Sequence, residues 1–300
     1  MQYFSIAKHG SARYECFLLG GKKMNKFIVA TFLLGILFGF AAGYYGCFLT
    51  TRPTDGGRRA YSYLENSYNS TLGLCYEHPG AKNVYWLSHD NVLASCVLQN
   101  HNREIANNIS LTLGKLSVLY GLAKHPSGML EDGRIDILMG QSNSVPPKMV
   151  STFVLAEDYY GSQLKTEVSL DESFDDFENY TDLLVYASLV EWRKGNYSRS
   201  NDYFLEANRT WDGIGFRDKA FDESVRTRGQ GSYETYKLGL FYLLAKTIGK
   251  EVSFEQELVQ RVWKCQDENG GFRTHYYENG FPEDSYTNTE TTSIILLANI

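Results

Sequence analysis

The stretch GFRTHYYENGFPEDSYTNTETTSIILLAN, residues 271–299, decides the fold. A glycine and an apolar residue lead through a long polar loop to Glu290, which opens an apolar segment. The same layout recurs at three further places, from Gly215-Phe216 to Glu234, from Gly73-Leu74 to Asp90 and, with a short loop, from Phe174 to Asp182. Such self-similarity indicates stacked copies of one supersecondary unit.

Two kinds of helical segment alternate along the chain. Charges lie on one side of the segments 58–71, 101–122, 197–211 and 254–267. The segments 91–99, 182–193, 234–248 and 290–299 are apolar nearly all round, which indicates burial on most faces. This alternation predicts an inner layer of buried helices and an outer layer of half-buried ones.

The connections between these helices are asymmetric. Turns from an inner to the next outer helix are short, whereas the loops from outer to inner helix, 71–90, 213–232 and 268–288, are long. Antiparallel helices therefore place the long loops, and the acids that follow them, at one end of the bundle. Segment 134–170 departs from the pattern, because IDILMG, STFVLAE and SQLKTEVSL are β-branched and alternating. We expect a small β-insert there, with Tyr160-Gly161-Ser162 as a tight turn.

The stretch CQDENGGF, followed by Asp284 and a Thr-rich entry into IILLA, resembles the repeat of α/α-toroid proteins such as terpenoid cyclases and protein prenyltransferase β-subunits. YWLSHDNVLAS and NTETTSIILLA also resemble a set of archaeal membrane-anchored proteins with this layout. The resemblance implies an all-α fold, an incomplete α/α toroid of helical hairpins. The chain has neither a D-x-D-D run nor a prenyltransferase zinc set, so neither activity follows from the resemblance.

An uncharged apolar run at residues 27–49 is long enough to cross a bilayer as a helix. Lysines precede it, which favours a cytoplasmic N-terminal tail at 1–26. The predicted organisation is then a tail, a transmembrane anchor at 27–49, a tether at 50–57 and an extracytoplasmic domain at 58–300. A cleaved signal peptide, starting at Met1 or at Met24, is the alternative.

Several features agree with an exported domain. Five N-x-S/T sequons follow the apolar run, at Asn69, Asn108, Asn179, Asn196 and Asn208. The net charge of −6 argues against a nucleic-acid partner. In a closed ring the first and last hairpins are neighbours, so Cys75 and Cys265 are expected to form a disulfide. Cys96 lies among apolar residues and is expected to be buried and reduced.

Four acids open the inner helices and are the candidate catalytic residues: Asp90, Asp182, Glu234 and Glu290. An acid in the first turn of a helix also stabilises that helix by capping N–H groups and by complementing the helix dipole, which is the structural alternative for each of them. Two carboxylates across a cavity are what glycoside hydrolysis requires, one as acid and one as base or nucleophile. The α/α-toroid glycosidases and polysaccharide lyases use this end of the fold, so the carbohydrate interpretation is an analogy with that fold.

Aromatic and polar residues near these acids are the candidate substrate-binding residues. They are Trp86, His89, Asn91, Trp211, Asp212, Arg217, Tyr233, Tyr236 and His275. Aromatic faces suit stacking on sugar rings, and histidines suit proton transfer near neutral pH. Packing of the aromatic residues, exposure of the histidines and a loop-ordering ion pair at 212–218 are the alternatives.

The sequence thus predicts a membrane-anchored extracytoplasmic protein that binds or processes carbohydrate, with the enzyme question open between a glycoside hydrolase and a polysaccharide lyase. A non-catalytic envelope scaffold is the alternative, and a terpenoid-type enzyme a distant one. The expected partners are the membrane and a glycan or cell-envelope polymer. No cofactor or metal is predicted, since the chain lacks H-E-x-x-H, G-x-S-x-G and G-x-x-x-x-G-K-[ST] motifs.

Overall fold

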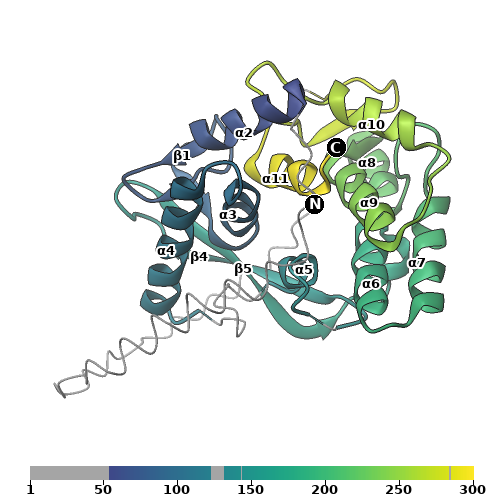
Figure 1. Ribbon diagram of the computed structural model, residues 1–300, viewed down its shortest axis with the longest axis horizontal. Helices are drawn as coiled ribbons and strands as arrows, with labels where there is room; N and C mark the ends of the chain where they lie inside the picture. The colour runs from purple at the N-terminus through teal and green to yellow at the C-terminus, as the bar shows by residue number, and fades with distance from the viewer. Residues whose placement is uncertain (1–53, 123–131, 143, 284) are drawn as a thin grey trace.

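Inner and outer helices form two layers in the computed structural model, which describes residues 54–122, 132–142, 144–283 and 285–300 (Figure 1). The inner helices contact one another in the order α3 (Val92–Leu98), α11 (Thr289–Ala298), α9 (Thr235–Ile248) and α6 (Thr181–Arg193). Each has an outer partner: α4 (Arg103–Leu119) packs on α3, α2 (Asp55–Ser67) on α11, α10 (Glu255–Lys264) on α9 and α7 (Tyr197–Arg209) on α6. A further helix, α8 (Lys219–Arg228), lies in the loop before α9.

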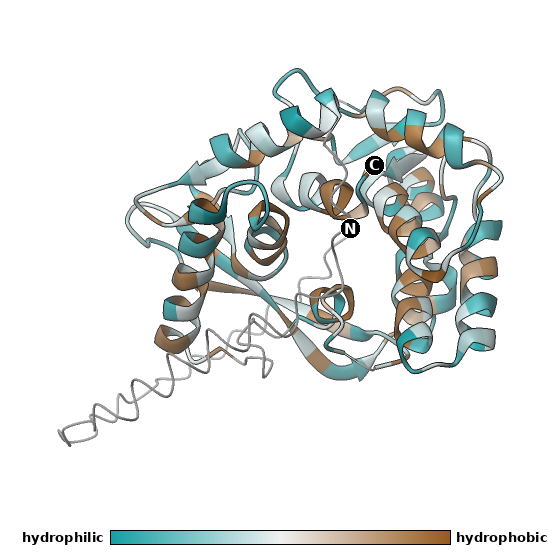
Figure 2. Cartoon of the chain, in the orientation of Figure 1, coloured by the Kyte–Doolittle hydropathy of each residue, from teal (hydrophilic) through white to brown (hydrophobic). Residues whose placement is uncertain are grey.

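The burial of these helices follows their sequence pattern. All residues of α3 are buried, and most residues of α6, α9 and α11 are buried as well. The outer helices bury one side only, as in α10, where Leu258 and Val262 face the core. Figure 2 shows the same contrast, with hydrophobic residues gathered on the inner helices. The predicted inner and outer helices are therefore confirmed.

The prediction of an all-α fold, an incomplete α/α toroid, is wrong. The structure is about 51% helical with 17% strand in three small sheets. Two of these sheets are short ladders beside the long loops: β1 (Tyr68–Asn69) pairs with β2 (Leu74–Cys75), and β6 (Ser232–Glu234) pairs with β7 (His275–Tyr277). The third sheet has the order β3-β5-β4. The fold is thus a mixed one, in which sheets join the helical units.

The β-insert holds the third sheet. Strands β4 (Lys148–Ala156) and β5 (Gln163–Ser173) form an antiparallel hairpin, and β3 (Val84–Trp86) pairs with β5 in parallel. Tyr160 and Gly161, both at positive φ, make the predicted turn, and the backbones of Tyr159 and Ser162 hydrogen-bond across it. The strand expected at IDILMG is instead helix α5 (Gly133–Leu138). Asp132 begins this helix, because its side chain accepts from the backbone N–H groups of Arg134 and Ile135.

The N-terminal predictions lie largely outside the described residues. This holds for the tail at 1–26, the anchor at 27–49 and the first part of the tether. Within the described ranges no helix has the length and apolar character needed to cross a bilayer. The end of the tether is helical, since α2 begins at Asp55 with Thr54 as its cap.

The predicted Cys75–Cys265 disulfide is wrong. Cys75 and Cys265 are buried free thiols, and Cys96 is buried as well. Cys75 lies on β2 with its thiol 3.7 Å from the carbonyl of Leu64 in α2, whereas Cys265 ends α10, which packs on α9. The two thiols thus belong to different contacts of the core. Cys96 is buried and reduced, as expected.

Candidate functional site

The four candidate acids lie together at the N-terminal ends of the inner helices. Asp90 lies in the π-helical turn η1 (Leu87–Asn91) that leads into α3, Asp182 and Glu290 lie in the first turns of α6 and α11, and Glu234 immediately precedes α9. Their charges act on one another: Glu290 raises the pKa of Asp90, and Glu234 raises the pKa of both Glu290 and Asp182. The predicted gathering of the four acids at one end is confirmed, and we call them the acid cluster.

These acids do not cap their helices. Asn288 caps α11 by accepting from the N–H of Thr291, and Asp218 accepts from the N–H of Thr181 at the start of α6. Glu234 occupies the cap position of α9 but makes no capping hydrogen bond. Capping therefore does not account for Asp182, Glu234 or Glu290. Asp182 and Glu290 do lie in the first turns of α6 and α11, where a negative charge also stabilises the helix through its dipole.

One half of the site is built around Lys237 of α9, and we call it the lysine half. The buried Nζ of Lys237 lies 2.6 Å from Glu234 Oε2, 2.6 Å from Asp218 Oδ2 and 3.9 Å from Asp182 Oδ1. Burial would raise the pKa of Glu234, but Lys237 outweighs it and holds that pKa well below its usual range. Burial raises the pKa of Asp182 despite Lys237, and the hydroxyl of Tyr236 donates to its Oδ2 at 2.9 Å.

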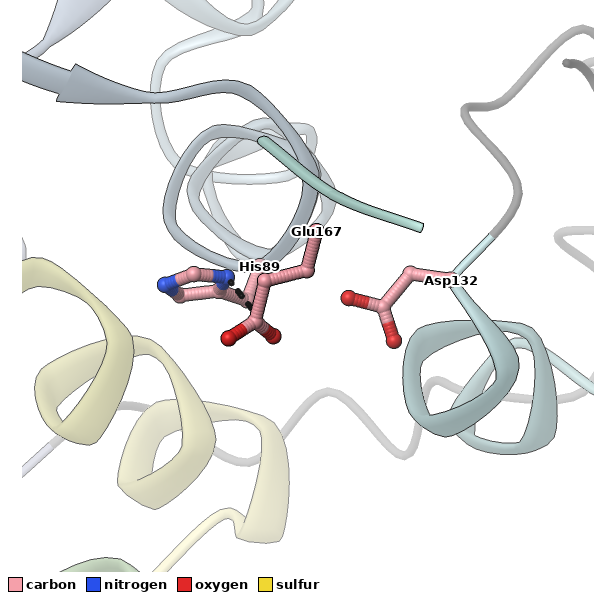
Figure 3. Close-up of side chains that lie close together, drawn as sticks. All are labelled: His89, Asp132 and Glu167. Atoms are coloured by element: carbon pink, nitrogen blue, oxygen red, sulfur yellow. Dashed lines mark ion pairs between the residues drawn. The ribbon is translucent and has the colours of Figure 1, made fainter. Parts of the chain in front are cut away.

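The other half surrounds His89, and we call it the histidine half. Its members come from η1, from the β-insert and from α11: His89, Asp90, Asp132, Arg134, Glu167 and Glu290. The imidazole places Nε2 3.6 Å from Asp90 Oδ1 and Nδ1 3.6 Å from Glu167 Oε2 (Figure 3). Burial, helped by Arg134, lowers the pKa of His89 to about 3. The ring is therefore uncharged at neutral pH.

Arg134 ties the β-insert into this half. Its Nη2 pairs with Glu167, and its Nε lies 3.6 Å from Asp132 Oδ1. Figure 3 shows Asp132 entering from the start of α5 opposite His89, with Glu167 between them. Burial raises the pKa of Glu290, an effect that Arg134 partly offsets, and burial with Glu290 raises the pKa of Asp90. Among the described residues, Asp90 Oδ2 and Asp132 Oδ2 are buried without a hydrogen-bond partner.

Sequence reasoning missed the members that the β-insert supplies. Asp132, Arg134 and Glu167 occur singly in segments that alternate, where a charge is usually solvated. A capping signal at Asp132 was present, since an aspartate precedes a buried Ile-x-Ile-Leu pattern. The pairing of β3 with β5, which brings Glu167 to His89, joins residues about eighty positions apart and has no local signal.

Three predicted substrate-binding residues lie in the site. The ring of Trp86 packs against His89 with 4.8 Å between centroids, and Tyr236 bonds to Asp182. His275 pairs across strands with Glu234, and burial lowers its pKa, which Glu234 partly offsets. Together with His89, these residues are brought to the acid cluster as predicted.

The other predicted substrate-binding residues have structural contacts. Asn91 holds the two ends of the loop at 71–90 together. Its side chain accepts from the N–H of Cys75 and donates to the carbonyls of Cys75 and Trp86. Trp211 stacks on Phe254 with 4.4 Å between centroids. The remaining three order the long loop at 213–232: Tyr233 donates to Asp212, and Arg217 lies 3.5 Å from Asp222.

Burial divides the site into a deep and a shallow part. The deep part has almost no contact with solvent and contains His89, Asp90, Asp132, Glu167 and Asp182. The shallow part is half-buried and contains Glu234, Tyr236, His275 and Glu290. Glu234 and Glu290 are therefore the acids of the cluster with the most contact with solvent.

Comparisons of the chain with known protein families, with curated proteins and with solved structures find no match.

Proposed function

We propose that this chain binds and hydrolyses a carbohydrate at the acid cluster, with Glu290 as general acid and Glu234 as the carboxylate that acts as base or nucleophile. The observation that carries the proposal is the pair of half-buried glutamates at the N-terminal ends of two contacting helices, α11 and α9, in opposite electrostatic environments. Neither side chain is needed to cap its helix.

The chemistry requires these opposite environments. Glycoside hydrolysis needs one carboxyl that keeps a proton to give to the leaving oxygen and one that stays ionised. Burial raises the pKa of Glu290, which favours its protonated form. The ammonium of Lys237 holds the pKa of Glu234 low, so this residue stays a carboxylate. Tyr236 and His275 beside them offer an aromatic face and hydrogen-bonding groups to a sugar.

The proposed location is the extracytoplasmic face of a membrane, with residues 27–49 as the anchor. Envelope polysaccharides would be within reach of the site there. Three of the sequon asparagines, Asn108, Asn179 and Asn196, are exposed in the structure, as glycosylation requires. Protease added to intact cells should digest the domain after residue 54, and protection of the domain would contradict this location.

The test of the activity uses the full chain in detergent on a glycan array and on polysaccharide substrates. We expect E290Q and E234Q each to lower the rate of hydrolysis by about 10²–10⁴-fold while glycan binding persists. The matched control is E278Q, which makes the same change on an exposed loop glutamate and should leave the rate unchanged. Binding without hydrolysis by the wild type would favour the scaffold alternative. A wild type that neither binds nor hydrolyses any glycan would overturn the proposal.

A further inference from the structure

The imidazole of His89 lies between two carboxylates with no hydrogen bond to either. Both ring nitrogens are 3.6 Å from a carboxylate oxygen, Nδ1 from Glu167 and Nε2 from Asp90. Ser88 Oγ also lies 3.5 Å from Nδ1. An uncharged imidazole has one N–H and one lone pair, so in either tautomer one nitrogen turns its lone pair toward a carboxyl group. A cation between this nitrogen and the facing carboxylate oxygen would remove the repulsion between their lone pairs.

Asp132 leaves a buried oxygen beside the same ring. Its Oδ1 accepts from the first N–H groups of α5 and has Nε of Arg134 at 3.6 Å. Its Oδ2 has no hydrogen-bond partner among the described residues, although the side chain is fully buried. A bare carboxylate oxygen in the interior carries a large desolvation cost unless a ligand satisfies it.

Arg134 does not meet this need. It pairs with Glu167 and lies near the capping oxygen of Asp132, so one guanidinium serves two carboxylates. In a metal site it would support the ligands from outside, since ligating carboxylates are themselves usually hydrogen-bonded. The arginine would then fix the direction in which Glu167 faces His89.

We propose that His89 Nδ1, Asp132 Oδ2 and Glu167 bind a divalent transition-metal ion of the zinc or manganese class. One ligand atom from each residue lies within 4.8 Å of the others. Metal–ligand bonds of ~2.0–2.2 Å place tetrahedral ligand atoms roughly 3.4 Å apart, close to the 3.6 Å between His89 and Glu167. One nitrogen with two carboxylate oxygens suits zinc or manganese better than calcium or magnesium, which prefer oxygen alone.

The placement of the ligands gives the β-insert a role. His89 comes from the repeat, whereas Asp132 and Glu167 come from the start of α5 and from β5, so the site forms only where the insert meets the inner helices. His89, Asp90 and Glu290 form a second group of suitable spacing on the other side of the ring. The Asp132 side is favoured because all three of its ligands are buried, whereas Glu290 is half-buried. The inference does not rest on the proposed hydrolysis.

The test is calorimetric titration of the EDTA-treated full chain in detergent with zinc or manganese chloride. We expect one equivalent to bind, with magnesium much weaker. D132N should weaken binding by at least about tenfold. This variant keeps the fold, because asparagine caps a helix as well as aspartate does. E167Q and H89A should weaken binding similarly, with folding checked by circular dichroism.

Two controls locate the ion. D90N and E290Q remove acids from the other side of the ring and should bind zinc within about threefold of the wild type. E278Q should bind like the wild type and exclude an adventitious surface site. Absence of binding by the wild type at millimolar zinc would overturn the site. Loss of binding in D90N and E290Q with retention in D132N would overturn the assignment of the ligands.

Discussion

Asp218 and Asp132 occupy the same position in the two halves of the site but have different partners. Each begins a short helix, α8 or α5, by accepting two backbone N–H groups through Oδ1. In the lysine half, Asp218 Oδ2 accepts from Lys237 at 2.6 Å and from the N–H of Thr181 at 2.9 Å. In the histidine half, Asp132 Oδ2 has no partner among the described residues.

The difference shows in which half of the site the protein itself supplies a partner for the buried carboxylates. Lys237 and its three carboxylates form a closed ion cluster that stabilises the junction of α6, α8 and α9. The histidine half has the same burial but less compensation, so it retains free binding capacity. Buried polar groups without partners in a native structure commonly mark a missing ion or ligand.

The largest expected effect is the loss of Lys237. K237M would leave Asp182, Asp218 and Glu234 buried without their common cation, and the free energy of unfolding should fall by about 3–5 kcal/mol. Urea denaturation of the two proteins measures this. The matched control is K246M, because Lys246 forms an exposed pair with Glu255 at 2.7 Å and should cost less than about 1 kcal/mol. Equal losses in both variants would remove the contrast between buried and exposed pairs.

The next effect compares the two capping aspartates directly. D218N keeps the cap of α8 through its amide oxygen, but its amide NH2 group accepts from neither Lys237 nor Thr181. The substitution should lower the free energy of unfolding by about 1.5–3 kcal/mol. D132N in metal-free protein keeps the cap of α5 and loses no Oδ2 partner, so its cost should stay below about 1 kcal/mol. Thermal or urea unfolding in EDTA tests the pair. A cost for D132N equal to that of D218N would show that Asp132 Oδ2 is in fact satisfied.

A smaller effect is the dependence on pH of the contribution that Glu290 makes to the free energy of unfolding. Burial raises its folded pKa above the unfolded value of about 4.3, so the folded protein binds its proton more tightly. The charged carboxylate therefore costs stability at neutral pH, and this cost disappears as the pH falls from the folded pKa toward the unfolded one. E290Q, which removes the charge, should be as stable as wild type or more stable at pH 7, and this advantage should shrink toward pH 4.

Melting temperatures of wild type and E290Q at several pH values, in EDTA, give the comparison. A large loss of stability in E290Q at pH 7 would instead assign Glu290 a structural role at the start of α11. Such a result would also weaken its proposed part as general acid.

The sequence predicted the features that have local signals. Apolar periodicity identified the inner helices, and the asymmetry of loop lengths placed the acids at one end of them. The hairpin of β4 and β5 was predicted from its alternating residues. The sheet of β6 and β7 was not predictable in the same way, because Ser232–Glu234 and His275–Tyr277 are three-residue strands that pair across two separate loops. The helix at Gly133–Leu138 was mistaken for a strand, since β-branched residues outweighed the capping aspartate before it.

The histidine half shows the same limit. His89, Asp90 and Glu290 belong to the repeat and could be named from it. Asp132 and Glu167 reach the ring through the pairing of β3 with β5 and the packing of α5 on α6, both of which join distant parts of the chain. Metal-ligand spacing is a sequence signal only when the ligands share one element, and here they come from three.

The smallest expected effect concerns Arg217, which the sequence placed among the substrate-binding residues. Its guanidinium is exposed, with Nε 3.5 Å from Asp222 and its centre 4.8 Å above the ring of Phe221. Exposed pairs of this kind contribute little, so R217A should change the free energy of unfolding by about 0.5 kcal/mol or less. Because Arg217 contacts the surface of α8 while Lys237 lies inside, R217A should also leave glycan binding unchanged. A marked loss of binding in R217A, at unchanged stability, would extend the site from the acid cluster onto the long loop at 213–232.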